Sequence, residues 1–101
     1  MNQYILDENG NPVIEHDLMK WAAWFGTNQR RVAKTDLPDN VLVSTVFLGL
    51  DHNWDDGGAP VLWETMIFGG PKDGYQNRYT SLEDAKNGHN LAVALAKMEV
   101  R

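Results

Sequence analysis

Two apolar runs separated by a polar, glycine-containing segment constrain the fold of this chain most strongly. Residues 41–50 read Val-Leu-Val-Ser-Thr-Val-Phe-Leu-Gly-Leu, and residues 61–68 read Val-Leu-Trp-Glu-Thr-Met-Ile-Phe. β-Branched and aromatic residues fill both runs without helical spacing, which is typical of strands. The segment 51–60 between them has the composition of a loop. We therefore predict a hairpin with a long tip, in which 41–50 is a central strand.

Weaker signals predict further strands. At the N-terminus, the Asn9-Gly10 step separates two short apolar stretches and indicates a small hairpin. Residues 30–35 are predicted as a strand with charged edges, broken by the turn residues 37–40. After the glycine-rich segment 69–74, residues 75–79 are short enough for an edge strand.

Two segments have the period of helices. The apolar face of the first consists of Leu18, Trp21, Ala22 and Phe25. Gly26 is well placed to end this helix. Ser81, with Asp84 three residues later, starts a second helix that we predict to run to about residue 100. Gly88 on its apolar face allows a close approach to a neighbour, and His89 beside it is predicted as a packed, hydrogen-bonded core residue.

The order of elements predicts an α+β fold. Strands follow one another without the alternating strand-helix repeat that a parallel sheet requires. We expect one domain over residues 1–101, built as an antiparallel meander sheet of about four strands with two helices packed on it. A chain of this length buries too little surface to leave much apolar area for a deep cavity.

Composition excludes several classes of function. The chain has no cysteine, so disulfides, thiolate metal sites and cysteine nucleophiles are excluded. Its net charge is −5, and its basic residues are dispersed except for the adjacent pair Arg30 and Arg31. Direct nucleic-acid binding is therefore not expected, whereas an acidic balance suits a basic partner, mimicry of a nucleic acid or ordinary solubility. No signal sequence or membrane-spanning stretch is evident, so we expect a cytoplasmic protein.

The loop after residue 50 has an incomplete resemblance to a calcium loop. Asp51, Asn53 and Asp55 have the alternate spacing of oxygen ligands. The glycine arrives one residue late at Gly57, and Leu62 stands where a bidentate glutamate is required. We predict no metal site and no cofactor.

A hydrolytic centre is also incomplete. His52 could act as a base, with Asp51 or Glu64 to orient it, but no serine or threonine is placed as a nucleophile. Glu64 interrupts an apolar run and must face solvent or pair with Arg31 or Arg78. We therefore predict no catalytic residue and no enzymatic activity.

Aromatic residues are the remaining functional signal. Trp21 is expected in the core, but Trp24 lies at the margin of its helical stripe and Trp54 lies in the loop tip, where an exposed indole indicates contact with a partner. The predicted partner-binding residues are Trp24, Trp54, Tyr75, Arg78 and Tyr79, together with the loop aspartates Asp55 and Asp56.

Three stretches of the chain resemble a family of small bacteriophage and prophage proteins that carry no assigned function. These are residues 43–52, residues 63–70, and Arg78 to Ser81 leading to Gly88 and His89. The resemblance implies a non-enzymatic phage accessory protein in the host cytoplasm. Such a protein would bind a macromolecular partner, with anti-CRISPR-like inhibition of a host defence system as its expected action.

Two other functions and a homodimer are alternatives. The first is a small-molecule or nucleotide binder in which Tyr75, Tyr79 or Trp54 stacks on a base. The second is a metal-dependent hydrolase at Asp51, His52 and Asp55. A homodimer is possible if the short edge strand pairs with a copy of itself.

Overall fold

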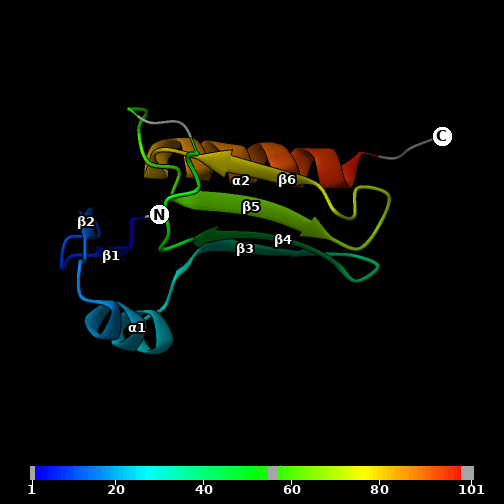
Figure 1. The fold of residues 1–101 in the computed structure, drawn as a ribbon. Coiled ribbons are helices and arrows are strands. Elements are labelled where there is room, and N and C mark those ends of the chain that lie inside the picture. Colours follow the sequence, from blue (N-terminus) through cyan, green and yellow to red (C-terminus); the bar gives the residue numbers. More distant parts are fainter. Residues whose placement is uncertain (1, 55–56, 99–101) are drawn as a thin grey trace.

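The computed structural model describes residues 2–54 and 57–98 (Figure 1). Its elements, in chain order, are β1 (Tyr4–Leu6), β2 (Pro12–Ile14), α1 (Leu18–Thr27), β3 (Arg31–Leu37), β4 (Val41–Phe47), β5 (Trp63–Phe68), β6 (Gln76–Tyr79) and α2 (Leu82–Lys97). The predicted α+β class is confirmed. Predicted Asp55 and Asp56 lie outside the described residues, as does the predicted end of the second helix near residue 100.

The main sheet is an antiparallel meander with the strand order β3-β4-β5-β6. As predicted, β4 is central, and β1 and β2 form a separate two-stranded hairpin. Strand β4 ends at Phe47 and not at residue 50, because the chain turns at Gly49 with a positive φ of 76°. A bulge between Arg31 and Ala33 marks the start of β3.

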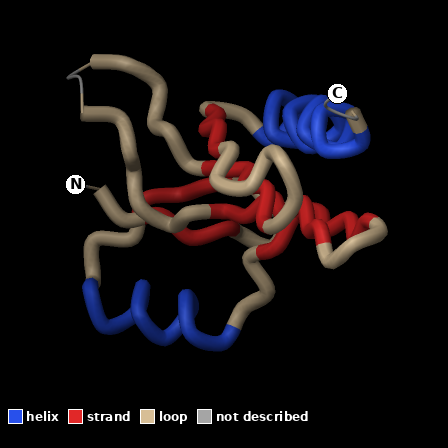
Figure 2. Tube along the Cα trace, turned by 90° about the vertical axis from the view of Figure 1, so that its right-hand side faces the viewer, coloured by secondary structure: helices blue, strands red, loops and turns tan. Residues whose placement is uncertain are grey.

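The register divides side chains between two faces of this sheet. Val43, Thr45 and Phe47 on β4 share the buried face with the odd-numbered residues of β5. Helix α2 packs on this face, as the view along the sheet shows (Figure 2). We call the opposite side the open face. It carries Arg31, Lys34, Asp36, Leu42, Ser44, Val46, Glu64, Met66, Phe68, Gln76 and Arg78.

Helix α2 lies flat on the sheet because its buried face is made of small residues. Its buried positions are Ala85, Gly88, His89 and Ala92, of which Gly88 and His89 were predicted from the sequence. Ser81 caps the helix by accepting a hydrogen bond from Asp84 N at 3.0 Å. At Gly88, a side chain would overlap the ring and hydroxyl of Tyr79, so the glycine permits this close approach.

Helix α1 lies at one end of the sheet, beside the N-terminal hairpin. It packs against β1 and reaches the main sheet through Trp24, whose ring meets that of Phe47 edge-on at 5.8 Å. Trp21 is half-buried, and its indole N–H donates to Tyr4 O at 3.1 Å and to Gly49 O at 3.0 Å. No residue of α1 is fully buried. The predicted apolar stripe was therefore wrong at Leu18, which is exposed in the first turn, and at Ala22, which is also exposed.

Candidate functional site

The histidine of α2 belongs to a buried polar network. His89 is 4% exposed, with its Nε2 at 2.9 Å from Thr35 Oγ1 and its Nδ1 at 2.8 Å from Thr45 Oγ1. Thr45 in turn is hydrogen-bonded to the hydroxyl of Thr65. Burial lowers the pKa of His89, which favours the neutral ring with one donor and one acceptor nitrogen. The prediction of a packed core histidine is confirmed.

The loop that carries His52 is held together by its own polar groups. Asp51 Oδ1 accepts hydrogen bonds from Asn53 N at 2.8 Å and from Val61 N at 2.9 Å. His52 Nδ1 lies 2.8 Å from Leu50 O, and a carbonyl can only accept, so this nitrogen is the donor. Among the residues that the structure describes, no three histidine, aspartate or glutamate side chains gather as a metal-ligand set.

Glu64 lies on the open face and pairs with Arg78, one of the two arginines predicted for it. The Arg78 Nε donates to Glu64 Oε2 at 2.9 Å, and Gln76 donates to the same oxygen. Strands β5 and β6 place Glu64 and Arg78 directly opposite each other. This arrangement is a cross-strand ion pair in which the Arg78 side chain is exposed and the Glu64 side chain is largely covered.

The structure separates the predicted aromatic contact residues. Trp54 is 76% exposed, and Arg78 is also exposed. Tyr79 is buried in the core against α2, so it cannot stack on a ligand or contact a partner. Burial also raises the pKa of its hydroxyl. Trp24 and Tyr75 are half-buried and pack on the two core clusters, which leaves only part of each ring accessible.

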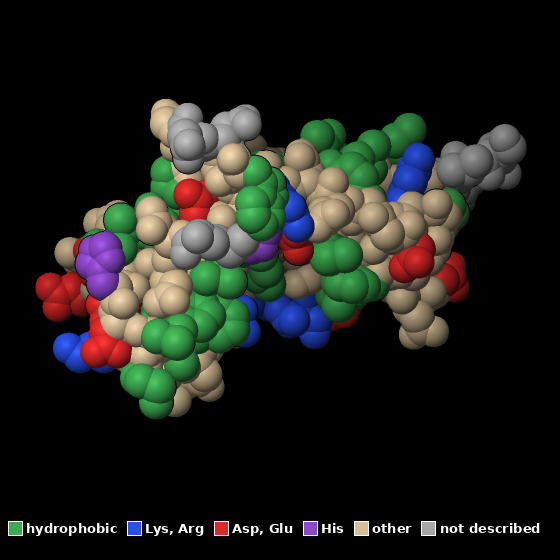
Figure 3. Space-filling model, viewed as in Figure 1, with side chains coloured by type: hydrophobic (Ala, Val, Ile, Leu, Met, Phe, Trp, Pro, Cys, Tyr) green, Lys and Arg blue, Asp and Glu red, His purple; other side chains and the backbone are tan. Residues whose placement is uncertain are grey.

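The sequence analysis missed an exposed apolar surface near the N-terminus. Four large side chains within seven residues are exposed, Val13 and Ile14 on β2 and Leu18 and Met19 in the first turn of α1; we call these four residues the N-terminal patch. Met19 is 76% and Leu18 60% exposed. In Figure 3, hydrophobic side chains gather at the lower left of the molecule, where Figure 1 places α1. The sequence carried a signal for this exposure. Apolar pairs stand both before and after the helix cap Asp17, and the two pairs cannot both face one core.

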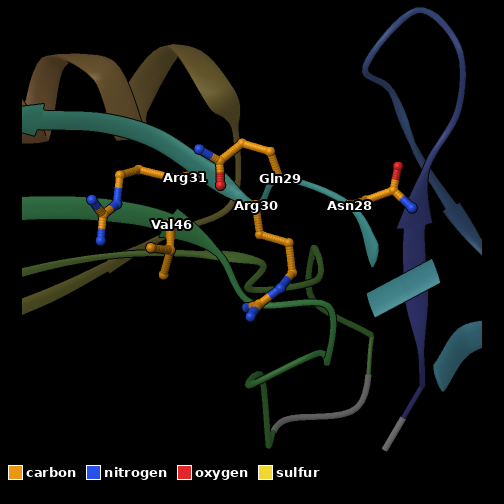
Figure 4. A pocket seen from close by; sticks show the side chains of 5 residues that line it. All are labelled: Asn28, Gln29, Arg30, Arg31 and Val46. Atoms are coloured by element: carbon orange, nitrogen blue, oxygen red, sulfur yellow. The ribbon is translucent and has the colours of Figure 1, made fainter. Parts of the chain in front are cut away.

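A polar pocket of about 360 Å³ lies where the chain enters β3 (Figure 4). Its walls are Asn28, Gln29, Arg30, Arg31 and Val46. The Arg30 guanidinium stacks over the ring of Phe25 at 3.7 Å, and its Nε is buried without a hydrogen-bond partner. Within residues 2–54 and 57–98, neither arginine has a carboxylate within ion-pair distance. We call this the arginine pocket.

Comparisons with known proteins find no matching family model, no matching curated protein and no matching solved structure. The resemblance to small phage proteins therefore stays a prediction. In the described part of the chain, neither helix has the length and apolar character needed to span a bilayer.

Proposed function

We propose that this chain is a non-enzymatic phage accessory protein that binds a macromolecular partner, and that it inhibits a host defence system in an anti-CRISPR-like manner. The N-terminal patch is the observation that carries the proposal. Its four large apolar side chains are 39–76% exposed although the domain has a core in which to place them. Burying such side chains in a complex yields about 1.5–3 kcal/mol each when burial is complete.

The surroundings of the patch suggest the chemistry of the partner. Glu15 and Asp17 lie within the same stretch, Asp7 and Glu8 precede it, and Lys20 is the first lysine or arginine in the chain. An apolar centre with an acidic rim complements an apolar surface with a basic rim. Proteins that act on nucleic acids carry such basic surfaces, because lysine and arginine neutralise phosphates. Host defence effectors that act on nucleic acids are therefore the class of partner that we propose.

The ionisable groups considered for catalysis already have partners within the fold, and this supports a binding role. His89 is held between two threonines, Asp51 closes its own loop, and Glu64 is paired with Arg78. Each of these groups therefore already has a hydrogen-bond or ion-pair partner within the fold, whereas a general acid or base must be able to reach a proton of the substrate.

Capture from a bacterial lysate, followed by binding to the purified partner, tests this proposal. We expect Met19→Lys to reduce partner affinity at least about tenfold, because loss of a buried anchor typically costs about 2 kcal/mol and about 1.4 kcal/mol already corresponds to tenfold. Leu91→Lys is the matched control, since Leu91 is 54% exposed on the other helix. Equal binding by both variants would show that the N-terminal patch is not the contact surface.

A second candidate function is the binding of a small phosphate-bearing ligand, such as a nucleotide, in the arginine pocket. The specific observation is the pair of arginines without carboxylate partners in a chain of net charge −5. Stacking on Phe25 holds the Arg30 guanidinium in place, so little side-chain freedom is lost when an anion binds. This site differs from the stacking on Tyr75, Tyr79 or Trp54 that the sequence suggested; of these three residues, Tyr79 is buried.

Thermal unfolding with ATP and with adenosine separates this function from protein binding. A ligand at 100 times its Kd stabilises the fold by about 2.7 kcal/mol, which raises Tm. We expect ATP to raise Tm, adenosine to have little effect, and Arg30→Gln to abolish the ATP shift. Lys86→Gln on α2 is the control for lost charge. The absence of an ATP shift in the unmodified chain would exclude this candidate.

A further inference from the structure

The outer edge of the sheet at β3 is longer than the edge at β6. β3 has seven residues and β6 has four. In the described part of the chain, β3 pairs with β4 and contacts α2, and no helix or strand lies along its other side (Figure 1). Such an edge presents unpaired backbone N–H and C=O groups that can pair with another strand. The homodimer considered from the sequence therefore has a longer edge available than the predicted strand 75–79.

Hydrogen bonds within the sheet determine which groups of β3 point outward. Phe47 N on β4 donates to Arg30 O on the β3 side at 2.8 Å, so the odd-numbered residues of β4 direct their backbone groups toward β3. Thr35 is paired with one of these odd-numbered residues, so its own backbone groups point inward. Lys34 and Asp36, its neighbours, therefore direct their N–H and C=O groups to the free edge.

We propose that a second copy of this chain pairs antiparallel with β3 along this edge, with Thr35 opposite Thr35 of the second copy. In this register Lys34 lies opposite Asp36 of the second copy, and Asp36 lies opposite its Lys34. Two opposite-charge pairs thus form at positions where the backbones exchange hydrogen bonds. Because the contact is the same from both copies, the dimer has a closed two-fold axis.

The charge pattern selects this register over its neighbours. The smallest shift that keeps every side chain on its own face is two residues. In one direction that shift places Lys34 opposite Lys34 of the second copy. In the other it places Asp36 opposite Asp36 and also brings Pro38, which has no N–H, opposite Lys34. Each shifted register therefore loses favourable charge pairs and gains like-charge contacts.

The two α2 helices are far enough apart in this arrangement not to collide. Helix α2 packs most closely on β4 and β5, about two strand spacings from the proposed two-fold axis. Strands are about 4.8 Å apart, so the two α2 helices would lie roughly 19 Å from each other, beyond the 8–10 Å of packed helices. Both helices lie on one side of the eight-stranded sheet. The two open faces then form one continuous surface on the other side.

Lys34 and Asp36 can be changed without disturbing the fold of one copy. Their side chains are exposed and lie 3.6 Å apart, Nζ to Oδ2, within the same chain. An exposed pair of this kind adds little to the stability of a monomer. A change in association on replacing either residue therefore reports on the contact between copies.

Charge exchange tests the proposal by sedimentation equilibrium over a concentration series. We expect the unmodified chain to dimerise. Lys34→Asp and Asp36→Lys should each raise the dissociation constant about tenfold or more, because each places like charges opposite each other twice. A 1:1 mixture of the two variants should recover the original affinity, since the two lysines on the edge of one chain then face the two aspartates on the edge of the other. Amide exchange at Lys34 and Asp36 should slow as the unmodified chain dimerises.

Three results would overturn the proposal. The first is an unmodified chain that stays monomeric throughout the series. The second is a pair of single variants that associate as tightly as the unmodified chain, which would place the contact elsewhere, for example at the N-terminal patch. The third is a mixture that remains as weak as its components.

Discussion

Gly88→Ala tests the contact that holds α2 on the sheet. A Cβ atom at this position would overlap the hydroxyl and ring of Tyr79, which is buried in the core and cannot move aside. Overpacking of this kind costs about 3 kcal/mol at the upper end of its usual range. Replacing glycine by alanine within a helix stabilises the helix by about 1 kcal/mol, which offsets part of this cost. We therefore expect a net loss of about 2 kcal/mol in the free energy of unfolding, or roughly 8–16 °C in Tm.

Gly26→Ala is the matched control, because Gly26 also lies within a helix but has open space where its Cβ would be. Chemical denaturation should show this variant to be as stable as the unmodified chain or up to about 1 kcal/mol more stable. In a Tyr79→Leu background, Gly88→Ala should cost less, because the two positions are in contact and their effects do not add. Equal stability of Gly88→Ala and Gly26→Ala would refute the close approach.

Three further predictions follow from hydrogen bonds of the fold. Ser81→Ala should lower the free energy of unfolding by about 1 kcal/mol in chemical denaturation, because it removes the α2 cap, and Ser81→Asp should restore it. Asp51→Ala should lower stability by roughly 1–3 kcal/mol and accelerate amide exchange at Val61, whose N–H loses its acceptor; unchanged exchange would contradict this role. Burial lowers the pKa of His89 in the folded state, so the unfolded chain binds more protons below about pH 6.5. The free energy of unfolding therefore falls as the pH drops below about 6.5, by at most about 1.4 kcal/mol per pH unit. Denaturation between pH 7.5 and 5.5 should show that the free energy of unfolding depends less steeply on pH in His89→Gln.

The sheet was predictable because its signals are local. The two apolar runs became β4 and β5, and the turn predicted at residues 37–40 from its Pro-Asp-Asn composition lies at 38–40, with Leu37 still in β3. Asp39 and Asn40 there have positive φ angles, which these residue types tolerate better than most. The start of α2 was also correct, since capping depends on residues three positions apart.

The exposure of individual side chains was less predictable, because it depends on contacts between distant segments. Tyr79 looked like a surface aromatic on an edge strand, but α2 folds back over it at Gly88. Leu18 has the spacing of a core residue, but α1 lies at the end of the sheet and its first turn meets no neighbour that buries it. The arginine pocket could not be predicted from the sequence either, because Val46 and Arg31 come together only through the pairing of β3 with β4.

The distribution of polar groups between the two sides of the sheet unites these observations. On the α2 side, His89 and its threonines are hydrogen-bonded to one another, so this network stabilises the fold. On the other side, Arg31 has no carboxylate partner among the described residues, and Lys34 and Asp36 pair only in solvent. A dimer through β3 would double this open face and hold its two arginine pockets in a fixed relation. A partner with two equivalent sites would then bind more tightly than one pocket alone allows.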